Sequence, residues 1–129
     1  MPSNRETVDA PGAPAAVGPY SHAVRAGDLL FCSGQVALDP ESGELLGETP
    51  ADQARKALEN LEAVCAEAGT SLDRAIRCTV YLTDLAGAWS EVNEVYGSFF
   101  GDAPPARAAI GVAALPKGAQ VEIDAIVAL

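Results

Sequence analysis

Two amphipathic helical patterns, separated by strand-like segments, constrain the fold of this chain most strongly. The first covers residues 49–69, where Thr49 and Pro50 mark the start of a helix and Gly69 marks its end. Its apolar stripe consists of Ala54, Leu58, Leu61, Cys65 and Ala68. The second covers residues 84–101, with a stripe of Leu85, Trp89, Val92, Tyr96 and Phe99. Each helix therefore has one face to bury against a partner layer.

Five other segments show the alternation or the turn boundaries of β-strands. They are residues 21–26, 29–36, 75–82, 107–114 and 121–129. Asp84 follows the third of them and is the expected N-cap of the second helix. The order β-β-α-β-α-β-β predicts an α+β fold, a two-layer sandwich in which both helices cover one face of a single mixed sheet.

The N-terminal region is expected to be irregular. Residues 1–19 hold four of the nine prolines, which predicts an extended arm over residues 1–16 without regular structure of its own. The chain as a whole, residues 1–129, has the length of one domain.

The last two strands indicate an oligomer. In residues 121–129 one face is entirely apolar, and the opposite face carries Glu122 and Asp124 beside Ile126. In residues 107–114 both faces consist largely of small apolar side chains. Helices can cover only one face of the sheet, and the other is too apolar to be left in water. We therefore expect that face to pack against another subunit of a closed homo-oligomer.

Charge and composition exclude several classes of protein. The chain has 18 acidic and 8 basic side chains, a net charge of −10, which disfavours nucleic-acid binding. It has no apolar run long enough to span a membrane and no N-terminal signal pattern, so a cytoplasmic location is expected. The three cysteines lack the spacing of a disulfide framework or a zinc site, and a single histidine cannot form a His-rich metal site.

Arg107 and Glu122 are the strongest candidates for chemistry, because both lie on the less apolar faces of two strands joined by a short loop. If the two strands are neighbours, the side chains project the same way, and two interpretations remain open. One is a structural ion pair at an interface. The other is a substrate site in which Arg107 binds a carboxylate and Glu122 acts as a base or orients water.

Four further positions allow a structural or a functional interpretation. Tyr20 is either a core aromatic or a ring that stacks on a flat substrate. Ser33 and Gly34 interrupt an apolar strand, which indicates either a β-bulge or a close approach to a ligand. Asn93 lies among the packing residues of the second helix, where its amide needs a hydrogen-bond partner. No glycine-rich nucleotide-binding motif is present.

Several of these residues fall in motifs that together resemble the RidA/YjgF family of reactive intermediate deaminases. In order along the chain, the motifs are the segments at residues 13–21, 33–35, 105–107, 115–118 and 121–125. The resemblance implies a chorismate-mutase-like α+β fold and a homotrimer with active sites between subunits. It also implies hydrolysis of enamines and imines such as 2-aminoacrylate to 2-keto acids and ammonia, without a cofactor or a metal.

The resemblance also assigns roles to individual residues. It makes Arg107 the carboxylate-binding group and Glu122 the group that positions water. Tyr20 becomes the stacking ring, and Ser33 and Gly34 line the pocket.

Asn93 matches the family's helix asparagine, whose role is less defined. Many relatives carry Cys where this chain has Ala109, which suffices if that position acts through its backbone N–H. The resemblance assigns no role to His22, where relatives often have an uncharged residue. Family members are also linked to ligand sensing, chaperone-like holding, translational regulation and ribonuclease activity. Binding of 2-keto acids without catalysis, or deamination of one pathway-specific enamine, are therefore the alternatives to a general deaminase.

Overall fold

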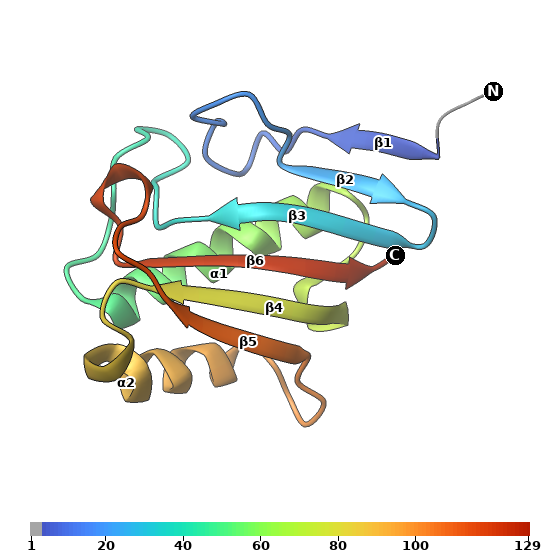
Figure 1. Cartoon of the computed structure of the whole chain (residues 1–129). Helices are drawn as coiled ribbons and strands as arrows, with labels where there is room; N and C mark the ends of the chain where they lie inside the picture. Colours follow the sequence, from blue (N-terminus) through green and yellow to red (C-terminus); the bar gives the residue numbers. More distant parts are fainter. Residues whose placement is uncertain (1–3) are drawn as a thin grey trace.

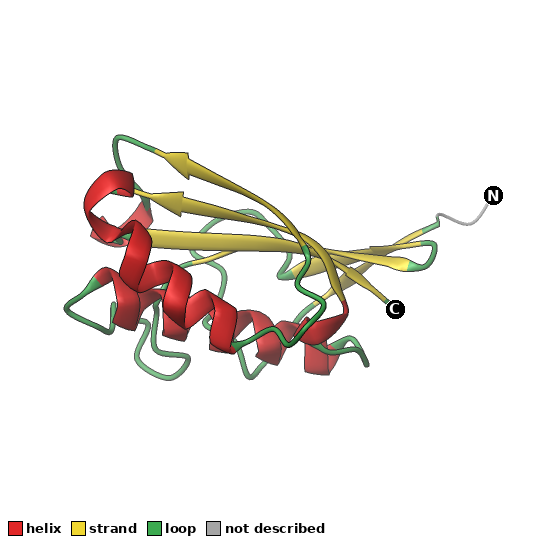
Figure 2. Cartoon of the chain, turned by 90° about the horizontal axis from the view of Figure 1, so that it is seen from below, coloured by secondary structure: helices red, strands yellow, loops and turns green. Residues whose placement is uncertain are grey.

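Residues 4–129 are described by a computed structural model of the chain, which forms two layers (Figure 1). The strands are β1 (Arg5–Val8), β2 (Ala23–Ala26), β3 (Leu29–Gln35), β4 (Ala75–Leu82), β5 (Ala106–Gly111) and β6 (Val121–Ala128). The helices are α1 (Pro50–Glu67) and α2 (Leu85–Ser98), and short 3-10 turns cover Leu72–Arg74 and Pro116–Gly118. Both helices lie on the same side of the sheet (Figure 2). The expected two-layer α+β sandwich is therefore confirmed.

The six strands form one mixed sheet in the order β1-β2-β3-β6-β4-β5. Four of the neighbouring pairs are antiparallel, and only β4 and β5 run parallel. Because α2 connects β4 to β5, this pair is a crossover unit, and the crossover helix covers the sheet edge next to β5.

Local signals in the sequence fix the beginnings of both helices. The Thr49 hydroxyl accepts a hydrogen bond from the backbone N–H of Asp52 at 3.1 Å, and the Asp84 carboxylate accepts one from Gly87 at the same distance. Side chains of α1, β3 and β6 then fill the space between the layers. The largest fully buried apolar side chains include Leu30, Leu58, Leu61, Leu82 and Ile123.

The N-terminal arm contains a strand that the proline content does not predict. β1 pairs antiparallel with β2, from Arg5 opposite Ala26 to Val8 opposite Ala23. Only Val8 of these four β1 residues is buried, so the strand has no amphipathic pattern to reveal it. Its stability comes from backbone hydrogen bonds to the edge of β2. The expected arm without regular structure is wrong at residues 5–8, and residues 1–3 of that arm lie outside the described residues.

Two general features of residues 4–129 bear on the sequence expectations. No helix there combines the length and the apolar character needed to cross a bilayer. The thiols of Cys32, Cys65 and Cys78 are all buried and free.

Candidate active site

A cavity of about 230 Å³ opens beside the end of β3 and brings together four of the expected site residues. Tyr20, Ser33, Gly34 and Glu122 all line it. The other lining residues are Pro14, Ala15, Val17, Gln35, Val36, Leu38 and Pro116. The cavity therefore joins the end of the N-terminal segment to the middle of the sheet.

Gly34 sits where β3 departs from regular pairing with β6. The register between the two strands shifts between Cys32 and Gln35, which is the irregularity that the sequence indicated. A Cβ atom at Gly34 would lie 2.5 Å from Oε2 and 2.9 Å from Cδ of Glu122. Only a residue without a side chain allows the carboxylate to lie against the strand here, so the predicted bulge is confirmed, whereas the approach of a ligand to Gly34 stays a prediction.

Glu122 is half-buried, and it alternates along β6 with the core residues Val121 and Ile123, so it lies on the face of the sheet that the helices leave uncovered. Burial raises the pKa of its carboxyl group, and the negative charge of Asp124 raises it further. Asp124 itself accepts hydrogen bonds from the Tyr81 hydroxyl at 3.0 Å and from the backbone N–H of Thr79 at 3.1 Å. A carboxylate with a raised pKa is a better proton acceptor, which suits a general base.

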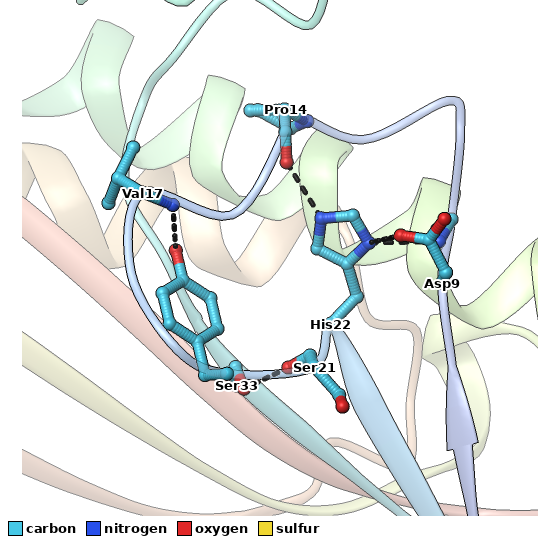
Figure 3. Close-up of polar contacts among 8 residues, drawn as sticks. Asp9, Pro14, Val17, Ser21, His22 and Ser33 are labelled. Atoms are coloured by element: carbon cyan, nitrogen blue, oxygen red, sulfur yellow. Dashed lines mark hydrogen bonds and ion pairs between the residues drawn. The ribbon is translucent and has the colours of Figure 1, made fainter.

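Ser33 and Tyr20 are held by hydrogen bonds to the loop that precedes β2. The Ser33 hydroxyl donates to the carbonyl of Ser21 at 2.6 Å (Figure 3), so its hydrogen is already used and its oxygen can act only as an acceptor toward a ligand. The Tyr20 hydroxyl accepts from the backbone N–H of Val17 at 3.2 Å. The Tyr20 side chain is 44% exposed, which excludes a core role and leaves the ring available to a ligand.

Arg107 lies on β5, the strand at one edge of the sheet, and its neighbours fix the orientation of its guanidinium group. The group lies over the rings of Trp89 and Tyr96, 4.9 Å and 4.8 Å from their centroids. One of its nitrogens donates to the Asn93 side-chain oxygen at 2.6 Å. Since cation–π contacts and this hydrogen bond orient the fork, it is prepared to bind an anion.

The contact of Arg107 with two aromatic rings is the feature that cannot be predicted from the sequence pattern alone. The helical spacing of Trp89 and Tyr96 predicts packing residues, which is confirmed for the buried Tyr96, whereas Trp89 is 37% exposed. Their spacing from Asn93, four residues before and three after, was the available signal, because it puts all three on one helix face. Ala109 lies two residues beyond Arg107 on the same side of β5, and it lines a neighbouring hollow with Leu85, Ala86 and Trp89.

Arg107 and Glu122 do not project the same way. They would do so only if their two strands were neighbours in the sheet. β4 lies between β5 and β6, so the two strands are not neighbours. Arg107 is level with Cys78, whose side chain is buried toward the helices, whereas Glu122 is level with Tyr81 on the uncovered face. Because side chains alternate along β4, the two charges point to opposite faces of one chain. A structural ion pair within the chain is therefore excluded.

The uncovered face of the sheet is as apolar as the strand patterns predicted. Phe31 and Ile110 are each 43% exposed there, and Ile126 lies beside Phe31 across the β3–β6 pair. Apolar side chains of this size on an open sheet face are typical of a surface that packs against another protein.

A single mixed sheet with two helices on one face, and with a carboxylate-lined cavity at a bulged strand on the other, defines a class of small α+β proteins. Within that class, the chain belongs to the RidA/YjgF family, since the family profile described as Endoribonuclease L-PSP matches residues 10–129.

Individual relatives agree with this assignment. The RutC family protein y4sK of Sinorhizobium fredii is 48% identical over 124 residues, which cover 96% of this chain and 98% of the relative. The 2-iminobutanoate/2-iminopropanoate deaminase of Mus musculus is 43% identical over 122 residues, covering 95% of this chain and 90% of the relative. The crystal structure of RidA from the Antarctic bacterium Psychrobacter sp. superposes with a TM-score of 0.91 at 43% identity, covering 96% and 99% of the two chains.

Proposed function

We propose that this protein hydrolyses small 2-imino acids and their enamine tautomers, of the 2-iminopropanoate and 2-aminoacrylate type, to 2-keto acids and ammonia. The observation that carries the proposal is that the polar groups of the site are divided between two faces of the chain. The cavity with Glu122 and the oriented guanidinium of Arg107 lie on opposite faces of one chain. Each is half of a site that a neighbouring copy can complete. The mouse relative with a deaminase name supports the choice of reaction.

The assembly that fits this division is a closed homotrimer with a site in each cleft between subunits. The apolar uncovered face supplies the contact surface, with Phe31, Ile110 and Ile126 removed from water on association. A cyclic arrangement makes every interface identical, so each carries one Arg107 from one chain and one Glu122 from the next.

Substrate binding then follows from the two halves. Arg107 binds the carboxylate through charge-assisted hydrogen bonds, each worth about 1.5–3 kcal/mol. Asn93 keeps the guanidinium oriented, and the backbone at Ala109 borders the carboxylate. On the other side of the cleft, Tyr20 stacks on the planar imino acid, and Ser33 and Gly34 form the wall behind it. A cavity of about 230 Å³ suits an acid with a short side chain.

The reaction needs a positioned water and a base. The oxygen of water bonds to C2 of the iminium, the C=N electron pair moves to nitrogen, and a water proton passes to Glu122. Glu122 returns that proton to the amino nitrogen, the C–N bond breaks, and the hydroxyl loses its proton as the carbonyl forms. The products are the 2-keto acid, ammonia and one proton. General-base assistance of this kind contributes about 10²–10⁴-fold in rate.

The negative charge of the protein supports a small-molecule substrate over a nucleic acid, because a net charge of −10 repels a phosphate backbone. Three free, buried cysteines are compatible with a reducing compartment, and we infer a cytoplasmic location.

A coupled assay tests the proposal directly. An L-amino-acid oxidase generates imines from a panel of amino acids, and the rates of imine loss and ammonia release are compared with and without the protein. We expect acceleration by the wild type and none by Arg107→Ala, with the same oligomer by light scattering. Binding of 2-keto acids without acceleration of any imine would instead support the non-catalytic alternative, and normal turnover by Arg107→Ala would remove that residue from the mechanism.

A further inference from the structure

His22 is a buried polar side chain for which the proposed mechanism has no use. Its side chain is only 4% exposed, at the start of β2. The ring lies between two parts of the N-terminal segment (Figure 3). Nδ1 is 2.8 Å from the backbone nitrogen of Ala10, and Nε2 is 2.7 Å from the carbonyl oxygen of Pro14.

These contacts determine which ring nitrogen carries the proton. A backbone N–H can only donate, so Nδ1 must accept from Ala10 and is unprotonated. Nε2 then carries the hydrogen and donates it to the Pro14 carbonyl, which can only accept. The observed geometry therefore corresponds to a neutral ring of a single tautomer, with both nitrogens satisfied.

The segment held by this ring forms one wall of the cavity. Pro14 and Val17 line the cavity, and the Val17 N–H donates to the hydroxyl of Tyr20, another lining residue. The backbone of His22 is fixed to the opposite wall, because its carbonyl accepts from the N–H of Ser33 at 3.0 Å. One residue thus connects the N-terminal wall of the cavity to the bulged end of β3.

We propose that His22 is a positioning residue whose two ring hydrogen bonds hold the wall at residues 10–17 in place for substrate binding. The part of this inference that concerns substrate rests on the proposed function. The part that concerns the wall does not, because it follows from the two hydrogen bonds and the burial of the ring.

Without the two ring nitrogens, the Ala10 N–H and the Pro14 carbonyl would lose their partner inside a buried site, which costs free energy. The wall at residues 10–17 would then lose both of its hydrogen bonds to the start of β2, and it would loosen.

Two variants of similar size test this role at one fixed pH. In His22→Gln the amide oxygen can accept from Ala10 and the NH₂ group can donate to Pro14, whereas His22→Leu offers neither group. We expect the KM for the imine to rise about 2- to 10-fold in His22→Leu and to stay within about twofold of the wild type in His22→Gln. The kcat should change little in either variant, since the side chain at this position does not touch the reacting atoms.

NMR provides a readout that does not depend on turnover. At one fixed pH, the Ala10 and Val17 amides should be less protected from hydrogen exchange in His22→Leu than in the wild type and in His22→Gln. Equal protection and equal KM in all three proteins would overturn the inference. Loss of the Ala10 protection in His22→Leu, with no imine turnover by any of the three proteins, would support the positioning role of His22 and refute the proposed function instead.

Discussion

The contact between Gly34 and Glu122 allows a test with a single methyl group. In Gly34→Ala the new Cβ would lie 2.5 Å from Oε2 of Glu122, so the carboxylate must retreat by about 1 Å to reach an ordinary contact distance. The atoms in conflict belong to a flexible side chain, and the fold can therefore absorb the change. We expect the free energy of unfolding to change by less than about 1 kcal/mol.

The effect on catalysis should be much larger than the effect on stability. A displacement of about 1 Å of a catalytic group costs on the order of 100-fold in rate, and complete loss of general-base assistance costs about 10²–10⁴-fold. We therefore predict a kcat about 100-fold below wild type for Gly34→Ala in the coupled imine assay. Gly101→Ala is the control, because no heavy atom lies within 4 Å of its added Cβ, and it should behave as the wild type.

A double-mutant cycle separates this mechanism from a general disturbance of β3. If Gly34→Ala acts through the carboxylate, it should lower kcat by less than about twofold when it is added to the Glu122→Gln variant. A kcat within threefold of wild type for Gly34→Ala, or the same 100-fold loss in both backgrounds, would refute the role of the close contact.

Two further perturbations address the charged groups. Arg107→Lys keeps the charge but loses the planar guanidinium group that lies over Trp89. We expect kcat/KM to fall about 10- to 100-fold with the oligomer intact. The control Arg55→Lys, on the exposed side of α1, should have no effect. Equal activity of the two lysine variants would contradict carboxylate binding by a bidentate guanidinium. For pH, a base must be ionised, so kcat/KM should fall as pH falls through the Glu122 pKa. Because the charge of Asp124 raises that pKa, Asp124→Asn should move the acid limb of the profile to lower pH, and an unmoved or upward-moved limb would argue against Glu122 as the base.

The elements that could be predicted from the sequence are those whose signals are local. Thr49 and Asp84 were expected to cap the helices, and both make the capping hydrogen bond. The alternation in residues 75–82 and 121–129 likewise predicted β4 and β6 almost to the residue. In each case neighbours in the chain supply the hydrogen bonds or the apolar face that defines the element.

The position of each strand in the sheet could not be predicted in the same way. β5 and β6 follow one another in the chain, yet β4 lies between them, because the crossover through α2 places β5 parallel to β4 at the edge. Strand order depends on contacts between distant segments, which periodicity does not report. For that reason the sequence allows Arg107 and Glu122 to be selected as candidate residues, but it does not predict that they point in opposite directions.

The cavity shows a similar division. Gly34 was recognisable because a glycine in an apolar strand indicates either a bulge or a close approach. Its partner Glu122 is far away in sequence, and only the register of β3 against β6 brings the two together. The contact of Arg107 with the rings of Trp89 and Tyr96 could not be predicted, because aromatic side chains at helical spacing are typical of a packed core.

A mixing experiment measures most directly whether Arg107 and Glu122 from different chains share one site. Arg107→Ala and Glu122→Gln, each inactive alone, are unfolded together in equal amounts and refolded. With random assembly of a closed ring, about one interface in four receives an intact Arg107 from one chain and an intact Glu122 from the next, so about a quarter of wild-type activity should return. If both groups acted within the same chain, the mixed oligomers would remain as inactive as their parents.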